Sequence, residues 1–183
     1  MTDETLKPEQ QALVDLFNRH VRAEFEQHDV AATMATMTPA PHLNHVPVMT
    51  GGRNRAEVQE FYTKDFIPGL PPDAGTVVLS QTVGQGRLVL ETVLTFTHTI
   101  EMPWILPGIK PTGRRVEVPV VLVVHAKDGK VESEHIYWDQ ASVLVQVGLL
   151  SADSLPVAGA EQARKMRAPT AEPSNTLIER TKG

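Results

Sequence analysis

Three side chains that could carry out acid–base chemistry alternate along a short stretch in the second half of the chain. His135, Tyr137 and Asp139 are spaced two residues apart, which places all three on one face of a β-strand. An imidazole, a phenol and a carboxylate in one row can move a proton at a bound substrate. The same row can also form a hydrogen-bonded structural cluster. We predict that Asp139 and His135 are catalytic and that Tyr137 contacts the substrate.

The opposite face of this strand carries Glu132, Glu134, Ile136 and Trp138. We assign that face to the outside of the domain because carboxylates are rarely buried. Ile136 and Trp138 beside charged residues are typical of a partly buried subunit contact. The pattern therefore predicts a homodimer through the outer sheet face, with the Asp139 row pointing inward.

A second pair of ionisable groups lies on a helix predicted over about residues 8–27. His20 and Glu24 are one turn apart and fall in the middle of its apolar arc. Burying a carboxylate is costly unless it is paired or protonated. The pair is therefore either a structural His–Glu contact in the core or part of a polar pocket. We include both residues among the catalytic candidates.

Three further histidines, His42, His45 and His98, are candidates for substrate contacts. His98 shares a face with apolar strand residues, and a satisfied core histidine is the competing interpretation. His42 and His45 could also bind zinc together with His20 and Glu24. Their spacing is not diagnostic and no HExxH-type pattern is present. We predict no metal.

Two aromatic residues complete the predicted substrate site. Trp104 lies in residues 101–114, an apolar segment broken by prolines and glycines that cannot be a regular strand. Such a loop suggests a pocket rim or a partner-facing surface, or side chains tucked under the sheet. Tyr62 lies on the apolar face of a helix predicted over residues 55–66.

The order of elements predicts an α+β domain. Three N-terminal helices should pack on a strongly curved, mostly antiparallel sheet and form a cone with an apolar interior. Residues 1–9 should be a flexible N-terminus, 10–150 the domain, and 151–183 an extension with a short helix and a flexible tail. The predicted helices span about residues 8–27, 29–37 and 55–66, and the predicted strands 76–83, 87–100, 115–126 and 130–139.

The composition limits the classes of function. The chain has 183 residues, a net charge of -5 and no cysteine, which excludes disulfides and thiolate chemistry. The mild negative charge does not favour nucleic-acid or membrane-surface partners. No apolar run is long enough to span a bilayer, and the acidic N-terminus lacks the features of a signal peptide. We therefore expect a cytoplasmic protein.

Several motifs, taken together and in order, carry a resemblance to a known family. They are the Pro111–Arg115 turn, Asp128-Gly129-Lys130, Tyr137–Gln140 and Gln146–Leu150. With the order of elements they make residues 10–150 resemble the SnoaL-like branch of the nuclear transport factor 2-like superfamily. That fold hosts polyketide cyclases, isomerases, epoxide hydrolases, dehydratases and binding modules.

The resemblance implies a role for one residue and leaves others unassigned. In SnoaL-type cyclases a late-strand aspartate moves a proton next to a carbonyl, and Asp139 matches that position. The histidine-rich interior and the segment after Ser151 depart from the pattern. No G-x-S-x-G nucleophile elbow is present, which excludes a hydrolase domain of that kind.

Three classes of function follow. The first is an enzyme without metal or organic cofactor that transfers protons on a small, largely apolar carbonyl or lactone compound. The second is a non-catalytic module that binds a small molecule. The third is a dimeric structural or interaction domain.

Overall fold

The computed structural model describes residues 6–153 and 155–180, so part of the expected flexible N-terminus, residues 1–5, lies outside the described residues. Its elements follow the predicted order, except that two strands not predicted from the sequence lie between the second and third predicted helices. They are α1 (Pro8–Phe25), α2 (Val30–Ala35), β1 (Met37–His45), β2 (Thr50–Gly52), α3 (Arg55–Phe61), the π-helical turn η1 (Tyr62–Phe66), β3 (Gly75–Val83), β4 (Arg87–Thr97), β5 (Arg115–Lys127), β6 (Lys130–Trp138), α4 (Gln140–Gln146), α5 (Glu161–Arg167) and α6 (Thr176–Arg180).

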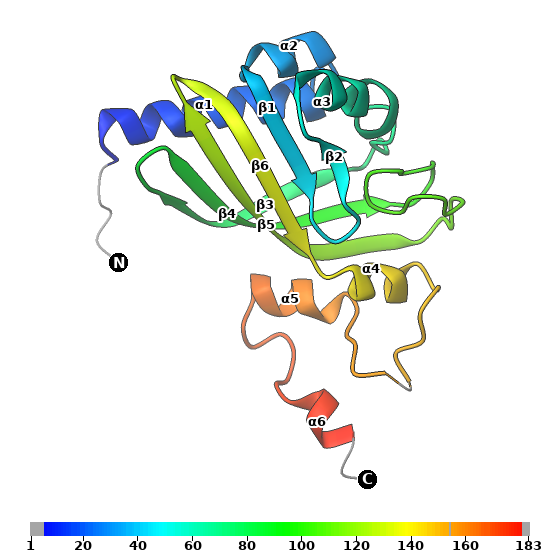
Figure 1. The fold of residues 1–183 in the computed structure, drawn as a ribbon. Coiled ribbons are helices and arrows are strands. Elements are labelled where there is room, and N and C mark those ends of the chain that lie inside the picture. Colours follow the sequence, from blue (N-terminus) through cyan, green and yellow to red (C-terminus); the bar gives the residue numbers. More distant parts are fainter. Residues whose placement is uncertain (1–5, 154, 181–183) are drawn as a thin grey trace.

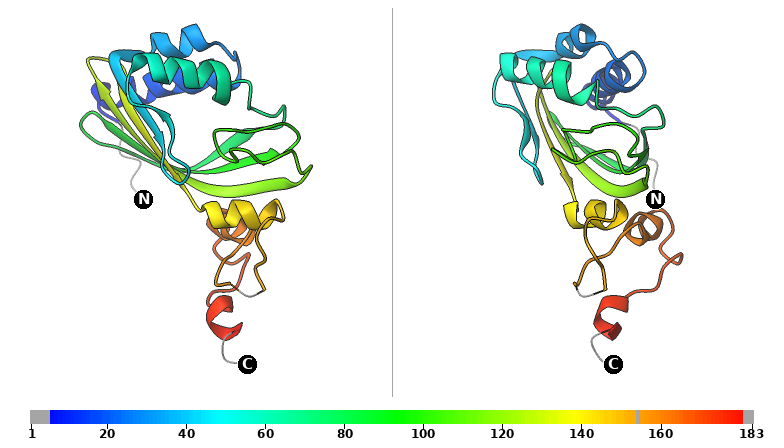
Figure 2. Two further views of the ribbon diagram at one scale, coloured as in Figure 1. Left: turned by 45° about the vertical axis from the view of Figure 1, so that its right-hand side comes forward. Right: turned by 90° about the vertical axis from the view of Figure 1, so that its right-hand side faces the viewer.

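The strands form one curved six-stranded sheet in the order β2-β1-β6-β5-β4-β3. Only the β1–β6 pair is parallel among these neighbours, and the other four pairs are antiparallel. The helices α1, α2 and α3 lie on one side of the sheet, as Figure 1 shows. The turned views of Figure 2 show the sheet bending away from these helices at one end. The predicted α+β cone is confirmed.

Local sequence signals account for the helix and turn boundaries. Asp29 caps α2, and its side chain accepts a hydrogen bond from the Ala32 N–H at 3.0 Å. The Asp128-Gly129 turn joins β5 to β6, and both residues have positive φ, 51° and 70°. These angles are those of the tight hairpin turn that an Asp-Gly dipeptide favours.

The first strand departs from a regular ladder where the sequence has prolines. Pro39 and Pro41 lack an N–H and cannot donate to a neighbouring strand. The register of β1 against β6 shifts between Met37 and His42. Beyond that shift Leu43 is paired with Glu134 on the central strand β6. For the β1 segment the sequence predicted only an extended conformation. The pairing places it next to β6, the strand that carries the predicted catalytic row.

Helix α1 packs on the sheet through the predicted apolar face. Leu13, Leu16 and Phe17 are buried. The third predicted helix starts at Arg55 as α3 and continues through the π-helical turn η1. Such turns occur mostly as single insertions, often at functional sites. This one directs the buried side chains of Tyr62 and Phe66 toward the sheet.

The C-terminal segment covers part of the other sheet face. Helices α4 and α5 lie against β5 on the side away from α1. The side chain of Gln146 bonds both backbone groups of Glu117, at 2.8 and 3.0 Å. Arg167 of α5 forms an ion pair with the Glu117 carboxylate. The predicted tail contains the short helix α6. Within the described ranges no helix is long and apolar enough to cross a bilayer.

Candidate active site

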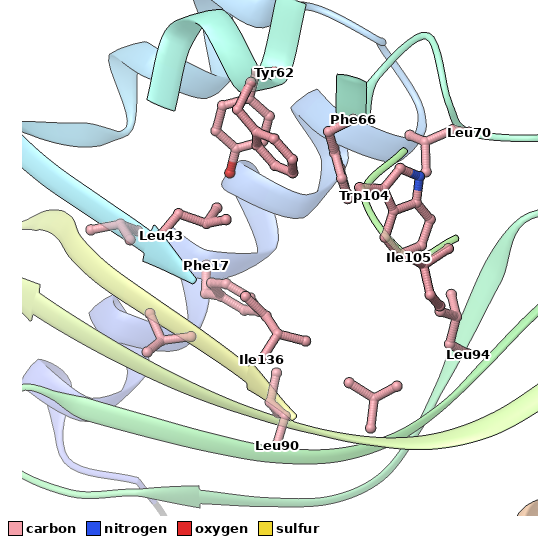
Figure 3. Close-up of a cluster of buried hydrophobic side chains, with 14 of the residues drawn as sticks. Phe17, Leu43, Tyr62, Phe66, Leu70, Leu90, Leu94, Trp104, Ile105 and Ile136 are labelled. Atoms are coloured by element: carbon pink, nitrogen blue, oxygen red, sulfur yellow. The ribbon is translucent and has the colours of Figure 1, made fainter. Parts of the chain in front are cut away.

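A cavity of about 360 Å³ lies between the helical layer and the inner face of the sheet. Figure 3 shows side chains from both layers directed into this region, among them Phe17, Tyr62, Trp104 and Ile136. Most of the lining is apolar, and its polar members include Glu24, Glu134, His45 and Tyr62. An apolar cavity with a few polar groups is the usual form of a small-molecule site.

The predicted orientation of β6 is wrong. Glu134 and Ile136 line the cavity, whereas Tyr137 is exposed and His135 is half-buried on the opposite face. The prediction placed Glu134 in water because an unpaired carboxylate avoids the interior. In the fold Glu134 has a partner, His20, and the pairing offsets the cost of burial.

Asp139 lies outside the cavity lining and caps α4. Its Oδ1 accepts hydrogen bonds from the N–H groups of Ala141 and Ser142, at 2.9 and 3.3 Å. Its Oδ2 accepts one from Gln162 Nε2 at 2.7 Å. Both oxygens therefore hold secondary structure in place. The sequence resemblance gave Asp139 an acid–base role, and its position here supplies a structural one.

Two of the three carboxylates in the cavity lining, those of Glu24 and Glu134, meet at one buried histidine. His20 Nε2 lies 3.0 Å from Glu24 Oε1 and 2.8 Å from Glu134 Oε1. The Tyr62 hydroxyl is 3.3 Å from the same nitrogen. Glu24 and His20 come from α1, Tyr62 from η1 and Glu134 from β6. We call these four residues the His20 cluster.

A threonine fixes the ring orientation of His20. The Thr36 hydroxyl donates its only proton to the Thr33 carbonyl at 2.6 Å. It must therefore accept from His20 Nδ1, which is 2.6 Å away. With Nδ1 protonated and Nε2 facing two carboxylates, the ring is held as an imidazolium. The Thr36 contact thus directs the charge of the ring at Glu24 and Glu134.

The charges around His20 support this assignment. Burial alone would lower the pKa of His20, but the carboxylates of Glu134 and Glu24 outweigh it and raise the pKa well above its usual value of 6.5. Burial, together with the same two carboxylates, raises the pKa of Tyr62 well above 10.0. At neutral pH the His20 cluster therefore contains a cation and a neutral phenol beside its glutamates.

His45 occupies a second, different environment on the cavity wall. Its ring lies among Phe61, Phe66, Trp104 and Trp138, with ring centroids 5.4 to 5.8 Å away. Burial lowers the pKa of His45 to about 3. No carboxylate is paired with it in the described part of the chain. His45 is therefore a neutral imidazole, in contrast to His20.

The loop carrying Trp104 forms part of the cavity wall, as one of the sequence alternatives proposed. Trp104 is buried, and its indole Nε1 donates to the Gly69 carbonyl at 2.8 Å. A Cβ at Gly69 would lie 2.5 Å from the Asp65 carbonyl oxygen, so this approach requires glycine. Thr50 Oγ1 donates to the Trp104 carbonyl at 2.8 Å.

The other predicted histidines lie away from the cavity. His42 contacts His135 on the outer sheet face, with their Nε2 atoms 3.1 Å apart. His98 is buried beside Thr112, and none of the residues that the structure describes forms a hydrogen bond with its Nε2. The four side chains considered as zinc ligands therefore do not surround a common point. His42 lies on the outer face of the sheet, whereas His20 belongs to α1, which covers the inner face. No group of three metal-ligating side chains arranged around a common point occurs in residues 6–153 and 155–180.

Sequence reasoning missed Glu134 as a site residue. The available signal was the alternation of side chains along β6, which puts Glu134 on the same face as the apolar residues Ile136 and Trp138. Those two apolar residues were assigned to a subunit contact instead. The orienting threonines, Thr36 and Thr50, carried no signal, since their partners are distant in the sequence or belong to backbone groups.

Comparison with known proteins places this geometry in a family. A sequence model of the SnoaL-like domain matches residues 17–134. No curated protein sequence matches the chain. Among solved structures, TsrD from Streptomyces laurentii is 14% identical with a TM-score of 0.62, and the match covers 80% of this chain and 100% of TsrD.

Two further structures have names that refer to polyketide cyclases. A candidate SnoaL-like polyketide cyclase from Jannaschia sp. CCS1 is 20% identical with a TM-score of 0.63, covering 81% of this chain and 99% of that one. IdmH from Streptomyces antibioticus, a candidate polyketide cyclase, is 20% identical with a TM-score of 0.58, covering 74% and 97%. At these identities the likeness concerns the fold.

Proposed function

The chain belongs to the family of SnoaL-like domains, and on that premise we propose that it is an enzyme that transfers protons on a small, largely apolar carbonyl compound. One observation carries the proposal: two buried carboxylates, Glu24 and Glu134, line an apolar cavity and share one imidazolium. Pairs of titratable groups in apolar surroundings are typical of acid–base sites.

Glu134 is the better candidate for the base. Its Oε1 is buried and accepts no hydrogen bond from the described residues, although His20 Nε2 is 2.8 Å away. A carboxylate oxygen that accepts no hydrogen bond has its lone pairs available for a proton from a bound substrate. Glu134 would take a proton from the carbon next to the carbonyl, so that a C–H bond breaks and an O–H bond forms. The electron pair would move to the carbonyl oxygen.

Tyr62 and His20 would support the resulting enolate. Tyr62 is a neutral phenol beside the carboxylates, so its hydroxyl can donate to the developing oxyanion. His20 is not part of the cavity lining, and we assign it a positioning role that lowers the charge of the glutamate pair. The enolate would then regain the proton at another carbon, which is an isomerisation, or attack a second carbonyl, which is a cyclisation.

Hydrogen exchange at a simple ketone tests this chemistry. 2-Tetralone, an apolar two-ring ketone, exchanges its α-hydrogens in D₂O at a rate that proton NMR measures. The wild-type protein should accelerate exchange over buffer, and Glu134→Gln should lower the acceleration by about 10²- to 10⁴-fold. Asp139→Asn is the matched control, because this carboxylate lies outside the cavity, and it should retain the activity. Equal rates for wild type and Glu134→Gln would contradict the proposal.

A non-catalytic binding module is the second candidate. Its supporting observation is that His20 already pairs with both carboxylates, an arrangement that a purely structural network would also adopt. This alternative predicts saturable ketone binding without exchange above the buffer rate. The two outcomes of the exchange experiment therefore separate the candidates.

The proposed homodimer uses the outer sheet face with a revised set of residues. Val121 and Tyr137 are neighbours across β5 and β6 on that face, and both are exposed. A contact there would bury two large side chains that are otherwise in water. Tyr137→Lys should convert a dimer into a monomer in light scattering. An unchanged mass would count against this contact.

A further inference from the structure

His45, a residue of the cavity wall, has an unused hydrogen-bond acceptor. Thr50 Oγ1 donates its only proton to the Trp104 carbonyl, so it must accept the contact from His45 Nδ1 at 3.2 Å. Nδ1 therefore carries the proton of the neutral ring, and Nε2 has a free lone pair. None of the described residues hydrogen-bonds this atom, and His45 lines the cavity.

The register of the sheet fixes the separation between the Cα atoms of His45 and of Glu134, the proposed base. Leu43 is paired with Glu134 and His45 with Ile136 on parallel strands. His45 is thus displaced by two residues along one strand and by one strand across, a Cα separation of about 8 Å from standard sheet spacings. The wall between them includes Leu43 and Ile136 and is apolar.

The charges along the cavity disfavour an anion. Two carboxylates outnumber the one imidazolium in the His20 cluster, and His45 contributes no positive charge. Arg22 also lines the cavity, but its side chain is 60% exposed and is paired with Glu26 at 3.6 Å. A carboxylate at the His45 end would therefore find neither a donor nor a counter-charge.

We propose that His45 Nε2 is a specificity subsite that selects neutral substrates carrying a hydroxyl group at the end of the molecule remote from the carbon that Glu134 deprotonates. The inference deepens the proposed function, on which it rests, by naming the substrate class as hydroxylated apolar ketones. A hydroxyl at this position satisfies the free acceptor. A methoxy group or a carboxylate leaves it unpaired.

A series of 6-substituted 2-tetralones tests the subsite. The substituent and the carbonyl lie at opposite ends of this two-ring skeleton. Dissociation constants from calorimetry at pH 7 should show the 6-hydroxy compound binding about tenfold more tightly than the 6-methoxy compound. The 6-carboxy compound should bind more weakly than both. Equal affinities for the hydroxy and methoxy compounds, or no binding of the hydroxy compound, would overturn the proposal.

Variants of His45 assign the preference to this residue. His45→Met removes the acceptor and should abolish the difference between the hydroxy and methoxy compounds. His45→Gln offers an amide oxygen instead and should restore part of it. A preference that persists in a folded His45→Met protein would refute the assignment, and the wild-type series decides the case if that variant does not fold. Binding needs no turnover, so failure here is distinct from failure of the hydrogen-exchange experiment.

Discussion

Replacing His20 by glutamine should destabilise the folded protein much more than the same replacement of Glu24. At neutral pH one imidazolium faces two carboxylates, all of them buried. His20→Gln leaves Glu24 and Glu134 close together without a counter-charge. Glu24→Gln leaves a compensated pair of His20 and Glu134. The two substitutions therefore change the net charge of the cluster in opposite senses.

The expected magnitudes follow from this difference. Removing one partner of a buried ion pair costs about 3–5 kcal/mol because the other charge stays buried and unpaired, and we expect this for His20→Gln. For Glu24→Gln we expect a loss of about 1 kcal/mol or less, since one lost hydrogen bond is partly offset by relief of like-charge repulsion. The double variant should lose less unfolding free energy than the two single variants lose in sum, by at least about 1 kcal/mol.

Urea unfolding at pH 7, followed by circular dichroism, measures all four proteins of this cycle. Comparable dependence on urea concentration would show that the unfolded states are alike. A loss for His20→Gln no greater than for Glu24→Gln would refute the charge assignment. Additive single effects would show that the two side chains do not interact.

Three further predictions concern titration and capping. Above pH 6.5 folded His20 keeps a proton that the unfolded chain releases, so the unfolding free energy should fall by about 1.4 kcal/mol per pH unit up to the raised pKa. Urea unfolding from pH 7 to 9 should show this slope in wild type, and its persistence in His20→Gln would contradict the assignment. For His45 the unfolded chain takes up a proton first as pH falls from 6.5 to about 3, so stability should decrease by about 1.4 kcal/mol per unit of acidification. The acid limb of the stability curve should be shallower in His45→Gln, and an identical limb would show that the ring is not held neutral. Asp139→Ala should cost about 0.5–2 kcal/mol through the lost α4 cap and leave ketone exchange unchanged, whereas lost exchange in a folded variant would return the acid–base role to Asp139.

Local signals in the sequence were sufficient for most elements. Pro8 at the start of α1, the Asp29 cap and the Asp128-Gly129 turn act through the backbone of their immediate neighbours. The paired placement of His20 and Glu24 was also readable, because helical periodicity puts residues four apart on one face. These features depend on nothing outside their own segment.

The orientation of β6 could not be read in the same way. A strand with Glu134 on one face and His135 on the other is ambiguous until a partner from another element is known. That partner is His20, more than a hundred residues earlier, and it reverses the preference of Glu134 for water. The capping role of Asp139 was missed for a related reason, since the same carboxylate chemistry serves a base and a helix cap equally well.

The His20 cluster joins two layers of the fold that otherwise meet largely through hydrocarbon. His20 and Glu24 belong to α1, while Glu134 belongs to β6, which has a hydrogen-bonded strand on each side. Deprotonating the ring would remove the attraction across this interface and leave repulsion between helix and sheet. Alkaline conditions should therefore loosen α1 while the strands remain paired. In amide hydrogen exchange the helical layer would open as a separate unit, and the cavity between helices and sheet would be the first part of the molecule to lose its shape.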